Sequence, residues 1–123
     1  MKVLLSIKPI YANKIFDGKK MFEFRKVIFI NPNVNKVIVY ASSPTQRVIG
    51  EFEIDDIITT NPSELWKKTK KYAGISEVFF YEYFQNRNIA HAIKIKNSKL
   101  YKRSLDLQSI IKGSPPQSFL YIK

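Results

Sequence analysis

Hydrophobic and polar positions change their spacing several times along the chain, and these changes predict the order of its elements. Val3 to Ile7 is an apolar run of strand length. Pro9 suits the first turn of a helix, and Gly18 suits the position just after its end, where a left-handed residue is favoured. The segment between them therefore predicts one short helix, with three side chains available to face a core: Ile10, Ile15 and Phe16.

After Gly18 the spacing becomes that of a strand. Phe22 and Phe24 point one way, whereas Met21, Glu23 and Arg25 point the other. Residues 27–30 continue or follow this strand. In a regular strand Lys20 and Glu23 would lie on opposite faces, so they can meet only if Lys20 belongs to the turn. A helix held between two strands is expected to gather five charged side chains, and we place the chemistry there: Lys8, Lys19, Lys20, Glu23 and Arg25.

The middle of the chain predicts two strands joined by a polar loop. Residues 36–41 are apolar on both faces, as expected of an interior strand. Residues 42–45 form a loop whose hydroxyl and N–H groups suit an anion. Val48 to Ile58 has the pattern of a long strand in which Gly50 marks a bulge or bend. The acids of this strand, which leave the remaining surface more basic, are Glu51, Glu53, Asp55 and Asp56.

Two helices are predicted next. Asn61 and Pro62 signal the start of the first, which covers residues 64–71. Its lysines at positions 67, 68, 70 and 71 are typical of a solvated face. Gly74 ends this region, and Ser76 caps a second helix that runs to Phe84. We assign the second helix's apolar and aromatic residues to the core rather than to a base-stacking surface: Val78, Phe79, Tyr81 and Tyr83.

The last part alternates as a half-buried strand over residues 89–96, in which His91 is expected to be a packed residue without a catalytic role. Residues 97–103 are expected to be a basic connection. Asp106 is positioned to cap a short helix over residues 107–112 before a final strand at 119–122. With several short strands, one bend and few parallel crossovers, the order predicts a small α+β fold, a mostly antiparallel curled sheet or barrel with flanking short helices. The absence of a repeat or long linker predicts one domain over residues 1–123.

Composition adds a strong basic charge to this outline. The chain carries 21 Lys and Arg residues against 10 Asp and Glu, a net charge of +11 with a sequence pI near 9.9. On so small a domain this favours a polyanion, most simply RNA, with DNA also possible. Without cysteine and with one histidine the usual zinc ligand sets are excluded, and we expect neither metal nor cofactor. No run approaches the length of a membrane span, so we expect a cytoplasmic protein that does not contact membranes.

Three sets of residues, in order along nearly the whole chain, resemble the ASCH family of the PUA-like superfamily. The first resembles the family's opening signature, the second its central strand pair and the third its closing strand. The matching segments are Ser6 to Pro9, Tyr11 to Ile15, Gly18 to Lys20, Glu23 to Arg25, Tyr40 to Pro44, Val48 to Phe52, and Pro115 to Tyr121.

The resemblance implies a PUA-like pseudo-barrel with a cleft between the first helix and the sheet, in a family that binds RNA or modified nucleobases. Bacterial acetylcytidine amidohydrolases of this family use a lysine, a threonine and a distant glutamate. By this resemblance Lys20 matches their lysine and Arg25 an arginine beyond it, whereas Glu23 stands at the threonine position and removes that hydroxyl nucleophile. Glu77 is the nearest candidate for the distant glutamate.

Two hypotheses about function follow. In the first, the basic cleft binds RNA or a modified nucleotide. In the second, the chain is a hydrolase acting on RNA or an acylated nucleoside, with Lys20 and Glu23 as a general acid and base. A structural alternative is that Glu23 only neutralises Lys20 or Arg25. The candidate ligand-binding residues supply cations, hydroxyls, an amide and aromatic rings: Ser6, Lys8, Tyr11, Lys20, Arg25, Tyr40, Ser42, Ser43, Thr45, Gln117 and Ser118.

Overall fold

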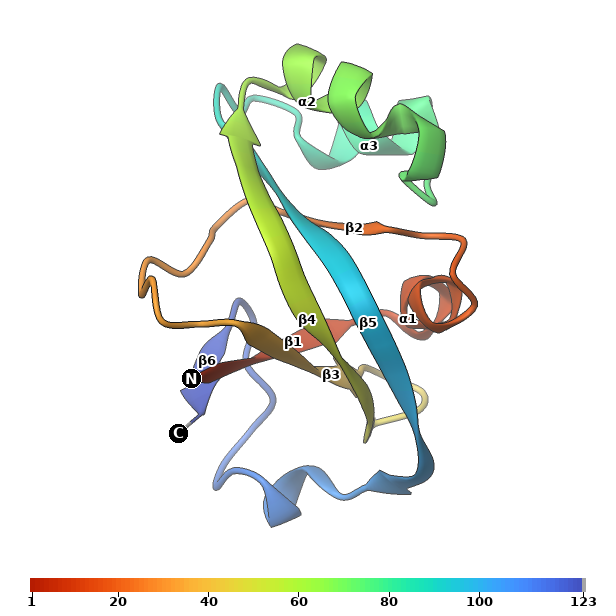
Figure 1. Cartoon of the computed structure of the whole chain (residues 1–123), viewed down its shortest axis with the longest axis vertical. Helices are drawn as coiled ribbons and strands as arrows, with labels where there is room; N and C mark the ends of the chain where they lie inside the picture. Colours follow the sequence, from red (N-terminus) through yellow and green to blue (C-terminus); the bar gives the residue numbers. More distant parts are fainter. Residues whose placement is uncertain (123) are drawn as a thin grey trace.

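The computed structural model, which describes residues 1–122, is built on one six-stranded mixed sheet with three short helices (Figure 1). Its strand order is β2-β5-β4-β3-β1-β6. The pair β1 and β3 is parallel, and the other four neighbouring pairs are antiparallel. In chain order the elements are β1 (Lys2–Ile7), α1 (Pro9–Phe16), β2 (Phe22–Arg25), β3 (Lys36–Ala41), β4 (Arg47–Thr60), α2 (Pro62–Thr69), the 3-10 turn η1 (Lys70–Tyr72), α3 (Glu77–Tyr83), β5 (Ala90–Leu105), the 3-10 turn η2 (Leu107–Ser109) and β6 (Leu120–Ile122).

The predicted α+β class with a mostly antiparallel sheet is confirmed. Strands β2 and β6 lie at the two edges of the sheet, and no pairing within residues 1–122 joins them, so the sheet does not close. The sequence prediction for residues 27–30 is wrong, because β2 ends at Arg25 and the chain then runs as a loop to β3. No helix in the described part of the chain is long and apolar enough to cross a membrane.

Strands β4 and β5 form the long central hairpin-like pair in Figure 1. The expected basic connection at residues 97–103 is in fact the second half of β5. Its side chains are mostly exposed, so it lacks the alternating burial on which the prediction relied. The pair bends at irregularities in register, one of which lies between Val48 and Gly50, as predicted for Gly50.

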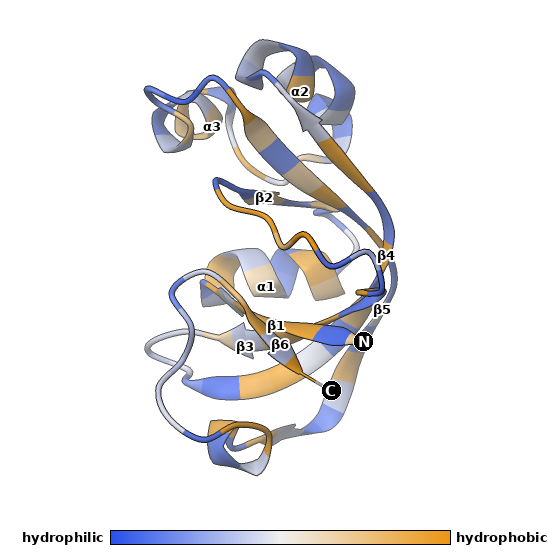
Figure 2. Cartoon of the chain, turned by 90° about the vertical axis from the view of Figure 1, so that its left-hand side faces the viewer, coloured by the Kyte–Doolittle hydropathy of each residue, from blue (hydrophilic) through white to orange (hydrophobic). Residues whose placement is uncertain are grey.

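Helix α1 covers one face of the sheet and builds the largest core cluster. Ala12 and Ile15 are buried there against strand residues such as Val39, Phe52 and Ile93. Figure 2 shows this helix lying beside β1 and β3, with its apolar residues spread along the ribbon. The prediction that Ile10 faces the core is wrong, since its side chain is 60% exposed. Ala12, three residues before Ile15, takes the inward position instead.

Helices α2 and α3 enclose a second core cluster with β2 and the start of β5. Asn61 and Ser76 cap these helices by accepting hydrogen bonds from the backbone N–H groups of Glu64 and Phe79. In α3 the core positions are Phe80 and Phe84, four residues apart. The other members of the predicted core set lie elsewhere: Val78 and Tyr81 are exposed, whereas Phe79 and Tyr83 are half-buried.

The opposite face of the sheet carries a third cluster. Leu4, Ile38, Tyr40 and Val48 alternate with the residues that face α1, and Leu107 of η2 packs on them. The predicted helix over residues 107–112 is shorter than expected and is only a 3-10 turn. The side chain of Asp106 does not cap this turn, because it forms an ion pair with Arg47 of β4 instead.

The acids of β4 do not leave the rest of the sheet uniformly basic, because neighbouring strands place lysines beside them. Lys36 of β3 contacts Glu51 at 2.7 Å, and Lys94 of β5 contacts Asp55 at 3.5 Å. The hydroxyl of Tyr101 donates to the second oxygen of Glu51 at 2.8 Å. The contact between Lys36 and Glu51 lowers the pKa of Glu51 and raises the pKa of Lys36. Two of the four acids of β4 are therefore neutralised by lysines of neighbouring strands.

Gly50 is a position where we expect substitution to be costly. A Cβ there would lie 2.5 Å from the ring of Phe16 and 2.6 Å from the backbone oxygen of Lys99, so α1 can approach the sheet only over a glycine. We expect Gly50→Ala to lower the free energy of unfolding by about 1 to 3 kcal/mol, measured by urea denaturation. Adding Phe16→Leu should recover part of the loss. A change below about 0.5 kcal/mol in Gly50→Ala would contradict this account.

Candidate functional site

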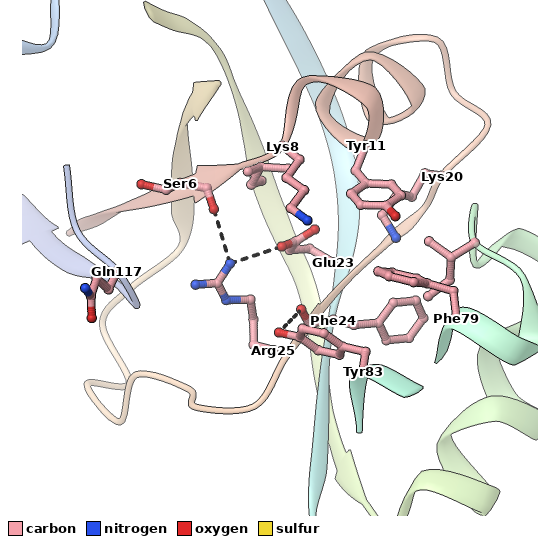
Figure 3. Close-up of a pocket in the computed structure, with 12 residues that line it drawn as sticks. Ser6, Lys8, Tyr11, Lys20, Glu23, Phe24, Arg25, Phe79, Tyr83 and Gln117 are labelled. Atoms are coloured by element: carbon pink, nitrogen blue, oxygen red, sulfur yellow. Dashed lines mark hydrogen bonds and ion pairs between the residues drawn. The ribbon is translucent and has the colours of Figure 1, made fainter. Parts of the chain in front are cut away.

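A pocket of about 310 Å³ opens between the end of β1, the start of α1, strand β2 and helix α3. Figure 3 shows Lys8, Glu23 and Arg25 near one another, and the amine of Lys20 among the rings of Tyr11, Phe24 and Phe79. The pocket combines residues far apart in sequence, from the first strand to the segment before β6. Its lining consists of Ser6, Ile7, Lys8, Tyr11, Lys20, Glu23, Phe24, Arg25, Ile75, Phe79, Tyr83 and Gln117.

Lys20 projects into this pocket from the turn between α1 and β2, as the sequence required if it was to approach Glu23. The residue is only 3% exposed, and its Nζ donates a hydrogen bond to the backbone oxygen of Ala73 at 2.8 Å. The same Nζ lies 4.7 Å from the ring centre of Phe24, a cation–π distance. Burial, partly offset by the charge of Glu23, lowers the pKa of Lys20 to about 8.

Gly74 makes room for this lysine. Its φ is +71°, a conformation that favours glycine, and a Cβ there would approach the Lys20 Cβ to 2.5 Å. Lys14 of α1 donates a hydrogen bond to the backbone oxygen of Gly74 at 3.1 Å. Together with the bond from Lys20 to Ala73, this joins α1 and the turn after it to two successive backbone oxygens. The glycine predicted to end a helical region thus also positions a buried amine.

Glu23 is the buried acid of the pocket, and its side chain is 8% exposed. Its Oε2 accepts a hydrogen bond from Nη1 of Arg25 at 3.2 Å. Burial raises the pKa of Glu23, against the opposing effects of Lys20 and Arg25. Among residues 1–122 no ion pair within 4 Å joins Lys20 to Glu23.

Arg25 has most of its hydrogen-bonding capacity committed to the protein. Besides Glu23, its guanidinium donates to the backbone oxygens of Ser6 and Ser118 at 3.4 and 2.5 Å. The hydroxyl of Ser6 in turn donates to the backbone oxygen of Pro116 at 2.8 Å. These bonds hold the segment before β6 beside β1 and bring Gln117 to the pocket.

Three aromatic rings form the opposite side of the pocket. Tyr11 and Phe79 are stacked with ring centres 5.6 Å apart, and Phe79 and Tyr83 follow at 6.4 Å. The hydroxyl of Tyr83 donates to the backbone oxygen of Phe24 at 3.3 Å, and burial raises its pKa. Phe79 and Tyr83 are four residues apart on α3, on the face next to the one that enters the core. The pocket therefore offers flat apolar surface beside buried charge.

The structure brings together most, but not all, of the residues that the sequence nominated. Seven line the pocket: Ser6, Lys8, Tyr11, Lys20, Glu23, Arg25 and Gln117. Ser42, Ser43 and Thr45 lie in the loop after β3 and are absent from its lining, although the N–H of Ser42 bonds to the backbone oxygen of Ile7. Ser118 contributes its carbonyl to Arg25 rather than a side chain to the pocket. Tyr40 is 5% exposed in the core cluster on the sheet's other face, so it cannot stack on a ligand here.

Five lining residues were missed by the sequence analysis: Ile7, Phe24, Ile75, Phe79 and Tyr83. Phe79 and Tyr83 were given a core role. The signal that distinguishes them is the i, i+4 spacing itself, because α3 and its C-cap residue carry two such aromatic pairs and only one can face the core directly.

The predicted packed role of His91 is confirmed by a contact of 2.8 Å between its Nδ1 and the hydroxyl of Thr59. Burial lowers the pKa of His91. His91 lies on β5 and does not line the pocket.

Across the described residues no group of three or more His, Cys, Asp or Glu side chains is arranged to hold a metal ion. The chemistry available in the pocket is therefore that of an ammonium group, a carboxylate and stacked rings.

The shifted pKa of Lys20 generates a prediction about stability. Its pKa is about 8 in the folded chain and 10.5 as the ordinary value, so between these pH values the unfolded chain binds more protons at this residue. Stability at this site should therefore rise as pH increases from 8 to 10.5, by on the order of 3 kcal/mol in total. We expect the free energy of unfolding of the parent to increase relative to that of Lys20→Met between pH 7.5 and 10. A difference independent of pH would contradict the burial of a charged amine.

Comparisons with known proteins place this geometry in a family. A model of the ASCH domain matches residues 5–99. The chain is 32% identical over 122 residues to the large ribosomal subunit protein uL22 of Ureaplasma parvum, a match that covers 98% of this chain but 39% of that protein. It thus spans less than half the length of this relative. It is also 27% identical over 125 residues to an ASCH domain-containing ribonuclease of Zymomonas mobilis, covering 99% of this chain and 84% of the relative.

A solved structure agrees with these matches. The crystal structure of ASCH from Zymomonas mobilis superposes with a TM-score of 0.90 at 26% identity, over 99% of this chain and 87% of that one. The family resemblance drawn from the three sets of sequence motifs is confirmed. The chain belongs to the ASCH domain family.

Proposed function

We propose that this chain binds single-stranded RNA, with one base and its sugar held in the pocket lined by Lys20, Glu23 and the α3 aromatics. The observation that carries the proposal is that stacked aromatic rings and buried charged groups line one cavity. Every nucleobase has a flat face that stacks on aromatic rings and an edge of hydrogen-bond donors and acceptors. The match to an ASCH domain-containing ribonuclease supports an RNA-related function.

Size favours a single nucleotide. A volume of about 310 Å³ lies at the lower end of the range for small-molecule pockets, too small to hold a base pair within a duplex. A base can enter only when it is splayed out from its strand. The net charge of +11 supplies attraction for the phosphates that remain outside.

The lining residues divide into two proposed roles. Lys8, Lys20, Glu23 and Gln117 contact the ligand: Lys8 is exposed at the pocket edge and suits a phosphate, and the other three suit a base edge. Arg25 is a positioning residue, because it already bonds to Glu23 and to two backbone oxygens. To bind a phosphate through two guanidinium N–H groups, Arg25 would have to give up those bonds.

A second candidate is hydrolysis of the bound RNA, favoured by the shifted pKa values of Lys20 and Glu23. Ionised Glu23 would remove the proton of a 2′-hydroxyl, whose oxygen attacks the adjacent phosphorus. Protonated Lys20 would give a proton to the departing 5′-oxygen, so that the P–O bond breaks without leaving a negative charge on that oxygen. The products would be a 2′,3′-cyclic phosphate, which water can then open, and a 5′-hydroxyl. The pKa of Glu23 is raised and that of Lys20 lowered, which brings both groups closer to neutral pH.

Binding is tested with a fluorescent single-stranded RNA hexamer. Under the proposal, Lys8→Ala and Lys20→Ala each weaken binding in a graded way, and three or four phosphate contacts give a log-log salt slope of roughly −2 to −3. Lys99→Ala is a matched control, because Lys99 lies on β5 and is absent from the pocket lining. Equal affinities for the parent and both pocket variants would overturn the proposal.

Turnover is tested with the same RNA by gel and mass spectrometry. The hydrolase candidate predicts cleavage that Lys20→Ala abolishes while binding is largely retained. Its rate should rise with pH as Glu23 ionises and fall again above about pH 8 as Lys20 loses its proton. Intact RNA at every pH, with salt-dependent retention by the parent, would exclude hydrolysis and leave a binding domain. A panel of acylated nucleosides, including acetylcytidine, tests the acylated-nucleoside alternative in the same assay.

A further inference from the structure

An exposed aromatic ring among lysines lies next to the segment that holds Lys20. Tyr72, the last residue of η1, is 48% exposed, and the Nζ of Lys71 lies 5.5 Å from its ring centre. The backbone oxygen of Tyr72 accepts a hydrogen bond from the N–H of Met21 at 2.9 Å. The next residue, Ala73, accepts the hydrogen bond from Lys20. Residues 72 and 73 are therefore bonded through their backbone oxygens to the segment that carries Lys20.

Further lysines surround this position. Lys19 is exposed in the turn that runs beside η1, and Lys14 reaches the same region through its bond to the Gly74 carbonyl. We call Lys14, Lys19, Lys71 and Tyr72 the Tyr72 patch. Its lysines come from α1, the following turn and η1, so they converge only in the folded chain.

We propose that the Tyr72 patch binds the nucleotide adjacent to the one held in the pocket, with its base stacked on Tyr72 and its phosphate between the lysines. This inference rests on the proposed function and extends it from one nucleotide to a short single strand. An exposed ring flanked by cations is the arrangement with which proteins bind single strands regardless of sequence, because rings stack on any base and cations follow the backbone. A strand with one base in the pocket has to pass only the Lys20 turn to reach Tyr72.

The patch also changes the interpretation of the lysines at positions 67–71, which the sequence analysis assigned to a solvated face. On α2 that assignment holds for Lys67, whose nearest charged partner is Glu64 at 3.4 Å. Lys71 differs because it belongs to η1 and contacts an exposed ring. Both Lys71 and Tyr72 belong to the 3-10 turn that begins at Lys70, after α2 has ended.

The chain supplies a matched control in Tyr81, another exposed tyrosine. Tyr81 is 40% exposed on α3, but its surroundings are acidic, with Glu77 and Glu82 lining the same shallow surface. A phosphate is repelled there and attracted at Tyr72. Replacing each tyrosine in turn therefore removes a comparable ring from a basic and from an acidic surface.

The experiment measures binding of a nucleoside monophosphate and of a single-stranded RNA hexamer to the full chain. We expect Tyr72→Ala to weaken binding of the hexamer by about 5- to 100-fold and to leave binding of the monophosphate unchanged. Tyr72→Phe should retain stacking and hence affinity, and Tyr81→Ala should match the parent. Lys71→Ala should reduce the salt slope of hexamer binding by about 0.7, whereas Lys99→Ala should not. Coincident thermal unfolding of the variants confirms that each is folded.

The outcomes separate this inference from the proposed function. Equal loss of monophosphate and hexamer in Tyr72→Ala would overturn the inference, since it would mean that the substitution only displaces Lys20. Hexamer binding unaffected by Tyr72→Ala but weakened by Lys20→Ala would overturn it while supporting the pocket. Hexamer binding that depends on Tyr72 but not on Lys8 or Lys20 would support the patch and overturn the pocket as the RNA site. No hexamer binding by the parent would overturn both.

Discussion

The buried amine of Lys20 is the constraint on which the rest of the site depends. Removing a charged amine from water is costly, and here a backbone carbonyl, an aromatic face and a nearby carboxylate offset only part of that cost, since burial still lowers the pKa of Lys20 to about 8. The compensating groups come from two segments: Ala73 follows η1, and Phe24 and Glu23 belong to β2. The amine thus requires α1, β2 and the start of the α3 region to meet at one point. The same requirement explains why a glycine follows Ala73, because any side chain there would occupy the lysine's space.

Much of this arrangement follows from the sequence. Pro9 and Gly18 bound the first helix, and the alternation from Phe22 to Arg25 places Glu23 and Arg25 on one face of a strand. The odd separation between Lys20 and Glu23 indicated only that the two can meet if Lys20 lies in the turn, which is where the structure has it. The long exposed half of β5 could not be predicted in the same way, because it is paired through its backbone while its side chains face solvent. Tyr40 was misplaced for a related reason: an interior strand buried on both faces gives no indication of which face meets the pocket.

Helix α3 shows how few residues decide between core and site. With its C-cap residue it carries two aromatic pairs at i, i+4 spacing, one buried in the second core cluster and the other facing the pocket. The rings contact one another, since Tyr83 packs edge-on against Phe84 at 4.8 Å. The pocket-facing rings are therefore supported directly by core rings.

The bonds from Arg25 to the segment before β6 have a consequence for synthesis of the chain. The pocket needs Ser6 and Lys8 from the beginning of the sequence and Gln117 from near its end, and β1 is flanked by β6 only after residues 120–122 are available. Arg25 pairs with residue 91 of β5 in the sheet, but its hydrogen bond to the backbone oxygen of Ser118 can form only once that residue is available. A nascent chain emerging from the ribosome can form α1 and the β3–β4 pair early, yet it cannot assemble this cavity. The pocket is thus a late product of folding, complete only in chains whose translation has passed residue 118.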